Sequence, residues 1–169
     1  MVGADVAFQV SGKQFMAHRC VLAARSPVFM VELYGRPMEE SSTNHVIRID
    51  DMEPKVFEAL LSFIYTDSFP KMKKQDEVAM AQHLLGAAER YDLKRLRLMC
   101  EDKLCRHVSK SNVTDMLTLV DQRPSCQGLK KACFEFLLKS PKVLSEVVAM
   151  EAFDHLIKEL SLSTLAARG

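Results

Sequence analysis

Hydrophobic periodicity changes near residue 18, and this change constrains the fold more than any other feature of the sequence. Residues 5–10 alternate between polar and apolar side chains, which is typical of a half-buried strand. The sequence predicts a turn at 11–13 and a second strand at 14–18, and therefore a hairpin. One face of this hairpin is expected to carry Val6, Phe8 and Val10. Beyond residue 18 the apolar spacing is mostly helical, with one more predicted strand at 45–50.

A corner between two short helices follows the hairpin. Ser26 is a residue type that caps helix N-termini, and Pro27 suits the first helical position, where a missing N–H breaks no helical hydrogen bond. We expect one helix before this corner and a second after it, ending at Gly35. The apolar residues of these two helices include Cys20, Val21, Ala23, Ala24, Val28, Phe29, Val31 and Leu33.

The rest of the chain is predicted to be helical, apart from a loop at 67–75. Helices are expected at 53–65, 77–91 and 93–108, from Ser111 or Asn112 onward, and at 126–138, 142–149 and 150–158. In the helix at 126–138 the inward side is predicted to consist of Leu129, Cys133, Phe136 and Leu137. The expected fold class is α+β, a small three-stranded sheet with helices packed around it, followed by an all-helical extension.

Composition narrows the classes of function. The 169 residues are 48% hydrophobic and 27% charged, with a net charge of +1, which argues against nucleic-acid or membrane-surface binding through overall charge. No apolar run is long enough for a membrane span and no leader opens the chain, so we expect an intracellular protein of the nucleus or cytoplasm. Five cysteines without a Cys-x-x-Cys pair argue against disulfides and structural zinc, and no metal or cofactor is expected.

Catalysis has little support in the sequence. His18 and Cys20 suggest a base and a nucleophile, but no third residue that would orient the pair is evident. The other histidines lack metal-ligand spacing, and the six glycines form no phosphate-binding loop. The short basic run at 71–74 lies beside Asp76 and Glu77, which is typical of a solvated loop. We therefore expect a protein that is not an enzyme.

Three stretches together resemble one family. They are "DVAFQVSGKQFMAHRCVLAARSPVF", "MEPKVFEALLSFIYTD" and "LLGAAERYDLKRLRLMCEDKL". They resemble the BTB (POZ) domain, in the branch of speckle-type POZ proteins and plant MATH-BTB proteins, from Asp5 to about Val108. Residues 111–138 are similar to the helix pair called the 3-box, and the remainder is similar to a short BACK domain. The resemblance implies a BTB domain at 1–108 and a helical region at 109–169.

The resemblance also implies a function, a homodimeric adaptor that docks on cullin-3 and brings substrates to a ubiquitin ligase. The family's docking motif matches Met38-Glu39-Glu40, where Met38 would enter an apolar groove and Glu40 would accept hydrogen bonds. The full set implied for cullin binding is Met38, Glu39, Glu40, Tyr65, Met116 and Leu117. The set implied for the dimer interface is Phe15, His18, Val21, Leu22 and Arg25. For Val21 and Leu22, a short helix between two arginines is not expected to bury every apolar side chain.

The sequence departs from this family in two ways. Relatives more often run Gly-Pro-Met before the docking motif, whereas Arg36 adds a residue here. Relatives also carry a substrate-gripping MATH domain before the BTB domain, and this chain starts almost at the first strand. A piece of a longer protein, a shortened gene product and an adaptor with another substrate-binding region all remain open. The alternative function is an oligomerisation or co-repressor platform in transcription, without a ligase.

Overall fold

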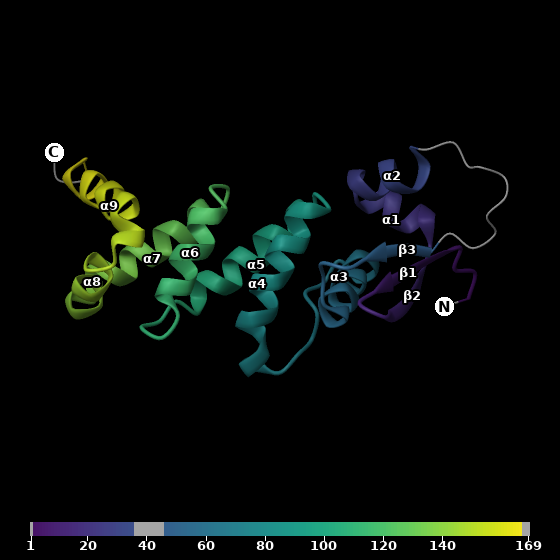
Figure 1. The fold of residues 1–169 in the computed structure, drawn as a ribbon, viewed down its shortest axis with the longest axis horizontal. Helices are drawn as coiled ribbons and strands as arrows, with labels where there is room; N and C mark the ends of the chain where they lie inside the picture. Colours follow the sequence, from purple (N-terminus) through teal and green to yellow (C-terminus); the bar gives the residue numbers. More distant parts are fainter. Residues whose placement is uncertain (1, 36–45, 167–169) are drawn as a thin grey trace. The chain divides into compact units, whose positions relative to one another are not determined.

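The computed structural model describes residues 2–35 and 46–166, which form two compact units, Met1–Cys100 and Glu101–Gly169 (Figure 1). The strands of the first unit are β1 Val6–Val10, β2 Lys13–Ala17 and β3 Val46–Ile49. Its helices are α1 Arg19–Arg25, α2 Pro27–Tyr34, α3 Pro54–Thr66, α4 Lys74–Arg90 and the first part of α5 Lys94–Arg106. The second unit adds α6 Val113–Gln122, α7 Gln127–Lys139, α8 Pro141–Val148, the 3₁₀ turn η1 Glu151–Phe153 and α9 Asp154–Ala166. The predicted α+β architecture is confirmed.

The sheet is built around the predicted hairpin. Ser11 and Gly12 both have positive φ, 43° and 86°, which matches the two-residue turn that suits the twist of paired strands. This turn sets the antiparallel register of β1 and β2, in which Phe8 lies opposite Phe15. β3 pairs with β1 in parallel, so the strand order is β2-β1-β3. The inward face of β1 is confirmed, because Val6, Phe8 and Val10 are buried.

The predicted corner is also confirmed. The Ser26 Oγ accepts a hydrogen bond from the Phe29 N–H at 3.1 Å, and Pro27 occupies the first turn of α2. The same hydroxyl donates to the carbonyl of Tyr91 at 2.6 Å, although Tyr91 lies 65 residues further along the chain. The buried Ser26 therefore both caps α2 and ties the corner to the end of α4.

Aromatic side chains fill the core of the first unit. Phe8 of β1 contacts Phe29 of α2 and Phe57 of α3, with ring centroids 5.8 Å and 5.1 Å apart. Phe29 stacks on Tyr91 at 4.2 Å with an interplanar angle of 13°. Burial raises the pKa of the Tyr91 hydroxyl to about 12. The sheet, the corner and α3 thus share one apolar core.

Two aspartates end the helices on either side of the predicted loop. Asp67 follows α3 with φ 54°, and Asp92 follows α4 with φ 49°, a left-handed conformation that aspartate tolerates better than most residues. The helix predicted at 77–91 begins earlier, at Lys74, so that Asp76 and Glu77 lie in its first turn, where carboxylates favour the helix dipole.

The second unit differs from the prediction in two places. Phe134 of α7 is buried, whereas the predicted Phe136 is only half-buried. The Lys130 ammonium lies over the Phe134 ring and pairs with Glu159, so α9 covers this margin of α7, which spacing alone does not reveal. The last predicted helix, 150–158, is instead the turn η1 followed by α9, which continues to Ala166.

Candidate protein-interaction surface

Helix α2 is apolar on two sides. Its inward side chains, Phe29 and Leu33, are buried in the core of the first unit. Its outward side also carries apolar residues, which are between 36% and 67% exposed. These residues form what we call the α2 stripe, and they are Val28, Met30, Val31 and Tyr34. Because spacings of three and four residues bring side chains together on a helix, the α2 stripe is one continuous apolar face, the kind that marks a protein-interaction site.

The end of the α2 stripe is held in place by Arg19. Its guanidinium lies 4.7 Å from the centre of the Tyr34 ring and donates a hydrogen bond to the carbonyl of Leu33. The backbone N–H of Arg19 donates to the Asp5 carboxylate at 2.7 Å. These contacts fix Tyr34 against the start of α1, so the stripe needs little ordering before it meets a partner.

The sequence pattern does not reveal the α2 stripe, because it places Val28 and Val31 in the second helix without indicating which side of the helix they occupy. One signal was present in the sequence. Six of the eight residues of α2, Pro-Val-Phe-Met-Val-Glu-Leu-Tyr, are valine, phenylalanine, methionine, leucine or tyrosine. A helix with apolar side chains on all sides cannot bury them all in a small domain.

The five residues predicted for the dimer interface differ in how far they are exposed. Leu22 is fully buried, which corrects its assignment: it packs in the core and offers no surface to a second copy. Phe15 is half-buried against Phe57, with ring centroids 5.3 Å apart. Val21 is half-buried, and Arg25 is exposed. For Phe15, His18, Val21 and Arg25 the role in a dimer stays a prediction.

His18 is committed to structural hydrogen bonds. Its backbone N–H donates to the Tyr65 hydroxyl at 2.8 Å, and its Nδ1 lies 2.9 Å from the same oxygen. In the neutral ring Nδ1 accepts a hydrogen bond from the Tyr65 hydroxyl. Nε2 then carries the proton and donates to the carbonyl of Val2 at 3.1 Å. Both ring nitrogens therefore have structural partners, which fits the non-catalytic interpretation of His18 and Cys20.

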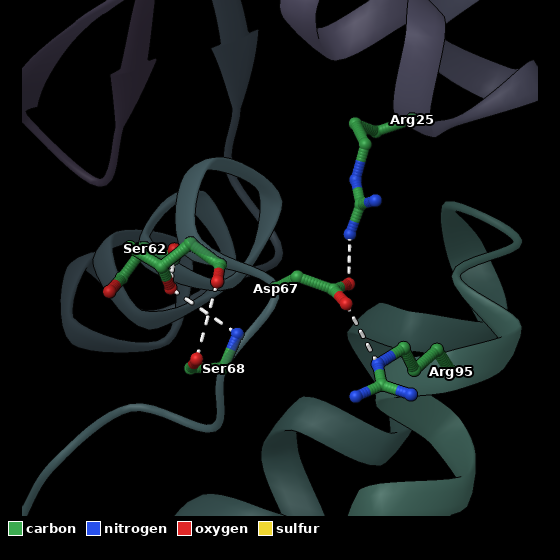
Figure 2. A network of polar contacts seen from close by, with 6 residues as sticks. Arg25, Ser62, Asp67, Ser68 and Arg95 are labelled. Carbon is green, nitrogen blue, oxygen red and sulfur yellow. Dashed lines mark hydrogen bonds and ion pairs between the residues drawn. The ribbon is translucent and has the colours of Figure 1, made fainter.

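Arg25 belongs to an ion-pair network shown in Figure 2. The Asp67 carboxylate at the end of α3 contacts Arg25 of α1 and, at 2.9 Å, the Nε of Arg95 of α5. The hydrogen bond from Arg25 is the main reason why the pKa of the Asp67 carboxyl lies below its usual range. The nearby hydroxyls of Thr66 and Ser68 bond only to local backbone. The network joins three helices of the first unit on an exposed surface.

The structure describes three of the six residues predicted for cullin binding, which are Tyr65, Met116 and Leu117. Met38, Glu39 and Glu40 lie outside the described residues. Tyr65 is half-buried, with its hydroxyl bonded to His18. Met116 and Leu117 are fully buried in the second unit, so they support the shape of α6 from within rather than present apolar side chains at its surface. This corrects their expected role as direct contacts.

In residues 2–35 and 46–166 no group of three His, Cys, Asp or Glu side chains is arranged to hold a metal ion. The five cysteines are free thiols, of which Cys20 is exposed. Within the same described ranges, none of the helices has both the length and the apolar character needed to traverse a bilayer.

Comparison with known proteins decides the family. The family model of the BTB/POZ domain matches residues 3–108, more than half of the chain. This chain is a member of the BTB/POZ family. The family model of the BPM/SPOP BACK domain matches residues 112–163, which include the region compared above with a 3-box.

Two relatives from Arabidopsis thaliana span nearly all of this BTB chain. The BTB/POZ and MATH domain-containing protein 3 is 43% identical over 162 residues, and protein 4 is 41% identical over 165 residues. These alignments cover 92% and 91% of the chain, but only 39% and 34% of the two relatives. Among solved structures, the BTB domain of zebrafish PATZ1 is similar at 24% identity and a TM-score of 0.48, over 59% of this chain and 73% of that one.

Proposed function

We propose that this chain is the self-associating and cullin-3-docking part of a substrate adaptor for a ubiquitin ligase, acting without catalysis in the nucleus or the cytoplasm. The observation that carries the proposal is the order of the two family matches, a BTB domain followed directly by a BACK domain of the BPM/SPOP type. Substrates would be bound by a region of the whole protein outside this chain, such as the MATH domain in the relatives' names.

Self-association would use the α2 stripe. Two copies related by a two-fold axis would each contribute the same four apolar side chains, so that one short helix buries its exposed face against its equivalent. Val31 is the most exposed residue of the stripe, at 67%, and Val21 of α1 is a further half-buried candidate. Burial of a valine side chain contributes about 1.5–3 kcal/mol, and the symmetry doubles each such contribution.

Light scattering after gel filtration tests this step. Val31→Asp should convert a dimer to a monomer at low micromolar concentration, because the interface would then hold two carboxylates without partners. Leu98→Asp is the matched control, since Leu98 of α5 is an exposed apolar residue outside the stripe, and this variant should remain dimeric. A monomeric unmodified chain, or two variants with equal effects, would rule out the α2 stripe as the dimer contact.

Cullin docking would use Met38, Glu40 and Tyr65. A flexible methionine suits an apolar groove between helices, and a glutamate can accept hydrogen bonds from a helix end or pair with a cation. Met38→Asp should weaken binding to the cullin-3 N-terminal domain at least tenfold in calorimetry. Met150→Asp, at an exposed methionine of the second unit, is the control and should bind like the unmodified chain. Equal affinity of all three would exclude Met38 from the contact.

The transcriptional platform is the less favoured function. A BACK domain of the BPM/SPOP type follows the BTB domain in this chain, and this order supports the ligase adaptor instead. The two functions differ in the surface that they need, since a platform would bind its partner near Val21 at the dimer groove. Loss of partner binding in Val21→Asp but not in Met38→Asp would support the platform.

A further inference from the structure

Helix α7 begins without a side-chain cap of its own. Its N-cap residue, Cys126, makes no capping hydrogen bond, although the first N–H groups of a helix need acceptors from outside the helix. Two of these groups find one acceptor on α5. The N–H groups of Gly128 and Leu129 donate to the Glu101 Oε1 at 2.8 Å and 3.1 Å. Glu101 therefore does for α7 what a serine or aspartate at the N-cap does in other helices.

The contact is close and largely shielded from water. Glu101 is only 8% exposed, so little water competes for these two hydrogen bonds. The positive end of the α7 dipole is also a favourable place for a carboxylate group. A Cβ atom at position 128 would lie 3.0 Å from the Glu101 Oε1. The glycine at 128 thus lets the backbone of α7 approach a carboxylate. Since 128 lies in the first turn of a helix, this approach explains a residue type that helices otherwise disfavour.

We propose that Glu101 caps α7 from α5 and thereby makes the C-terminal half of α5 part of the BACK-type unit. The compact unit begins at Glu101, eleven residues before the BACK match at 112 and eight before the predicted boundary at 109. Leu104, one turn after Glu101, is also fully buried. A boundary drawn at 108 would separate the helical unit from its own cap and from a core residue. This proposal does not depend on cullin binding.

A double-mutant cycle in the full chain tests the cap. Glu101→Ala should lower the melting temperature by roughly 5–10 °C, since it leaves two N–H groups without their carboxylate. Gly128→Ala should also lower it, because the new Cβ would push the Glu101 carboxylate back by a few tenths of an ångström and weaken its two hydrogen bonds. In the Glu101→Ala background the same Gly128→Ala change should raise the melting temperature, because alanine then contributes only its better helix propensity. The reversal of sign is what the contact predicts.

Hydrogen exchange supplies a local measurement. The amides of Gly128 and Leu129 should exchange at least tenfold faster in Glu101→Ala, while amides of α6 keep their rates. Asp102→Ala is the matched control, because Asp102 is exposed and pairs only locally, with Arg106 at 2.7 Å. If Glu101→Ala does not fold, Glu101→Gln replaces it in the exchange measurement only: it keeps an acceptor oxygen but loses the charge, so the amides of Gly128 and Leu129 should exchange faster by a smaller factor while amides of α6 keep their rates. A Gly128→Ala effect of equal sign in both backgrounds, or unchanged exchange at Gly128 and Leu129, would overturn the proposal.

Discussion

Removal of the Ser26 hydroxyl should destabilise the first unit more than the small size of a hydroxyl group suggests. Ser26→Ala deletes the acceptor of the Phe29 N–H and the donor to the Tyr91 carbonyl. Ser26 is buried, at 1% exposure, so water cannot readily replace either bond. Since Ser26 begins α2, the same change should also loosen the helix that carries the α2 stripe.

The size of the effect follows from two terms. Loss of a serine N-cap costs about 1 kcal/mol, and a buried carbonyl left without its donor costs about 1–3 kcal/mol. The free energy of unfolding should therefore fall by about 2–4 kcal/mol. The control Ser68→Ala removes an exposed hydroxyl that bonds only to the carbonyl of Thr66, and should change stability by less than about 0.5 kcal/mol.

Urea denaturation followed by circular dichroism measures this difference. Ser26→Ala should lower the midpoint without changing the slope, which indicates lost stability rather than an altered denatured state. Ser26→Thr keeps a hydroxyl and should restore part of the loss. A midpoint equal to that of Ser68→Ala would refute the conclusion that one hydroxyl ties α2 to the end of α4.

Two further predictions concern titratable groups. The pKa of the Asp67 carboxyl in the folded chain lies below its ordinary value of 3.8. The ion pairs of Asp67 therefore stabilise the fold fully above pH 3.8, and this stabilisation is lost as the pH falls through the lowered pKa. Asp67→Asn should therefore destabilise the chain at pH 7 but not at pH 2, and an equal loss at both would contradict the ion-pair explanation. Burial raises the pKa of the Cys133 thiol to about 12, so iodoacetamide at pH 8 should label the exposed Cys20 in the folded chain and leave Cys133 unlabelled, as peptide mass mapping would reveal.

Local chemistry made the hairpin and the corner predictable. The alternation of β1, the turn at Ser11-Gly12 and the Ser26-Pro27 cap each act between residues close in sequence, so the pattern contains the information needed. The partner of the Ser26 hydroxyl could not be predicted in the same way, since Tyr91 becomes its neighbour only when α4 packs against the corner.

The side of each helix that becomes covered was harder to predict. Leu22 and Val31 are similar aliphatic residues on neighbouring short helices, but Leu22 is buried and Val31 is exposed. Spacing identifies an apolar face, whereas tertiary packing determines which face meets a neighbour. Glu101 was the hardest side chain to predict. A glutamate within a predicted helix gives no sign that it accepts hydrogen bonds from backbone N–H groups 27 and 28 residues further along the chain.

Direct titration with the cullin-3 N-terminal domain tests the central claim, that this BTB and BACK chain is a cullin-docking module. Isothermal calorimetry with the unmodified chain should give a dissociation constant in the micromolar range or tighter, with one cullin domain per chain. Met38→Asp should abolish most of the heat. A folded, unmodified chain that produces no binding heat and no complex by light scattering would contradict the account.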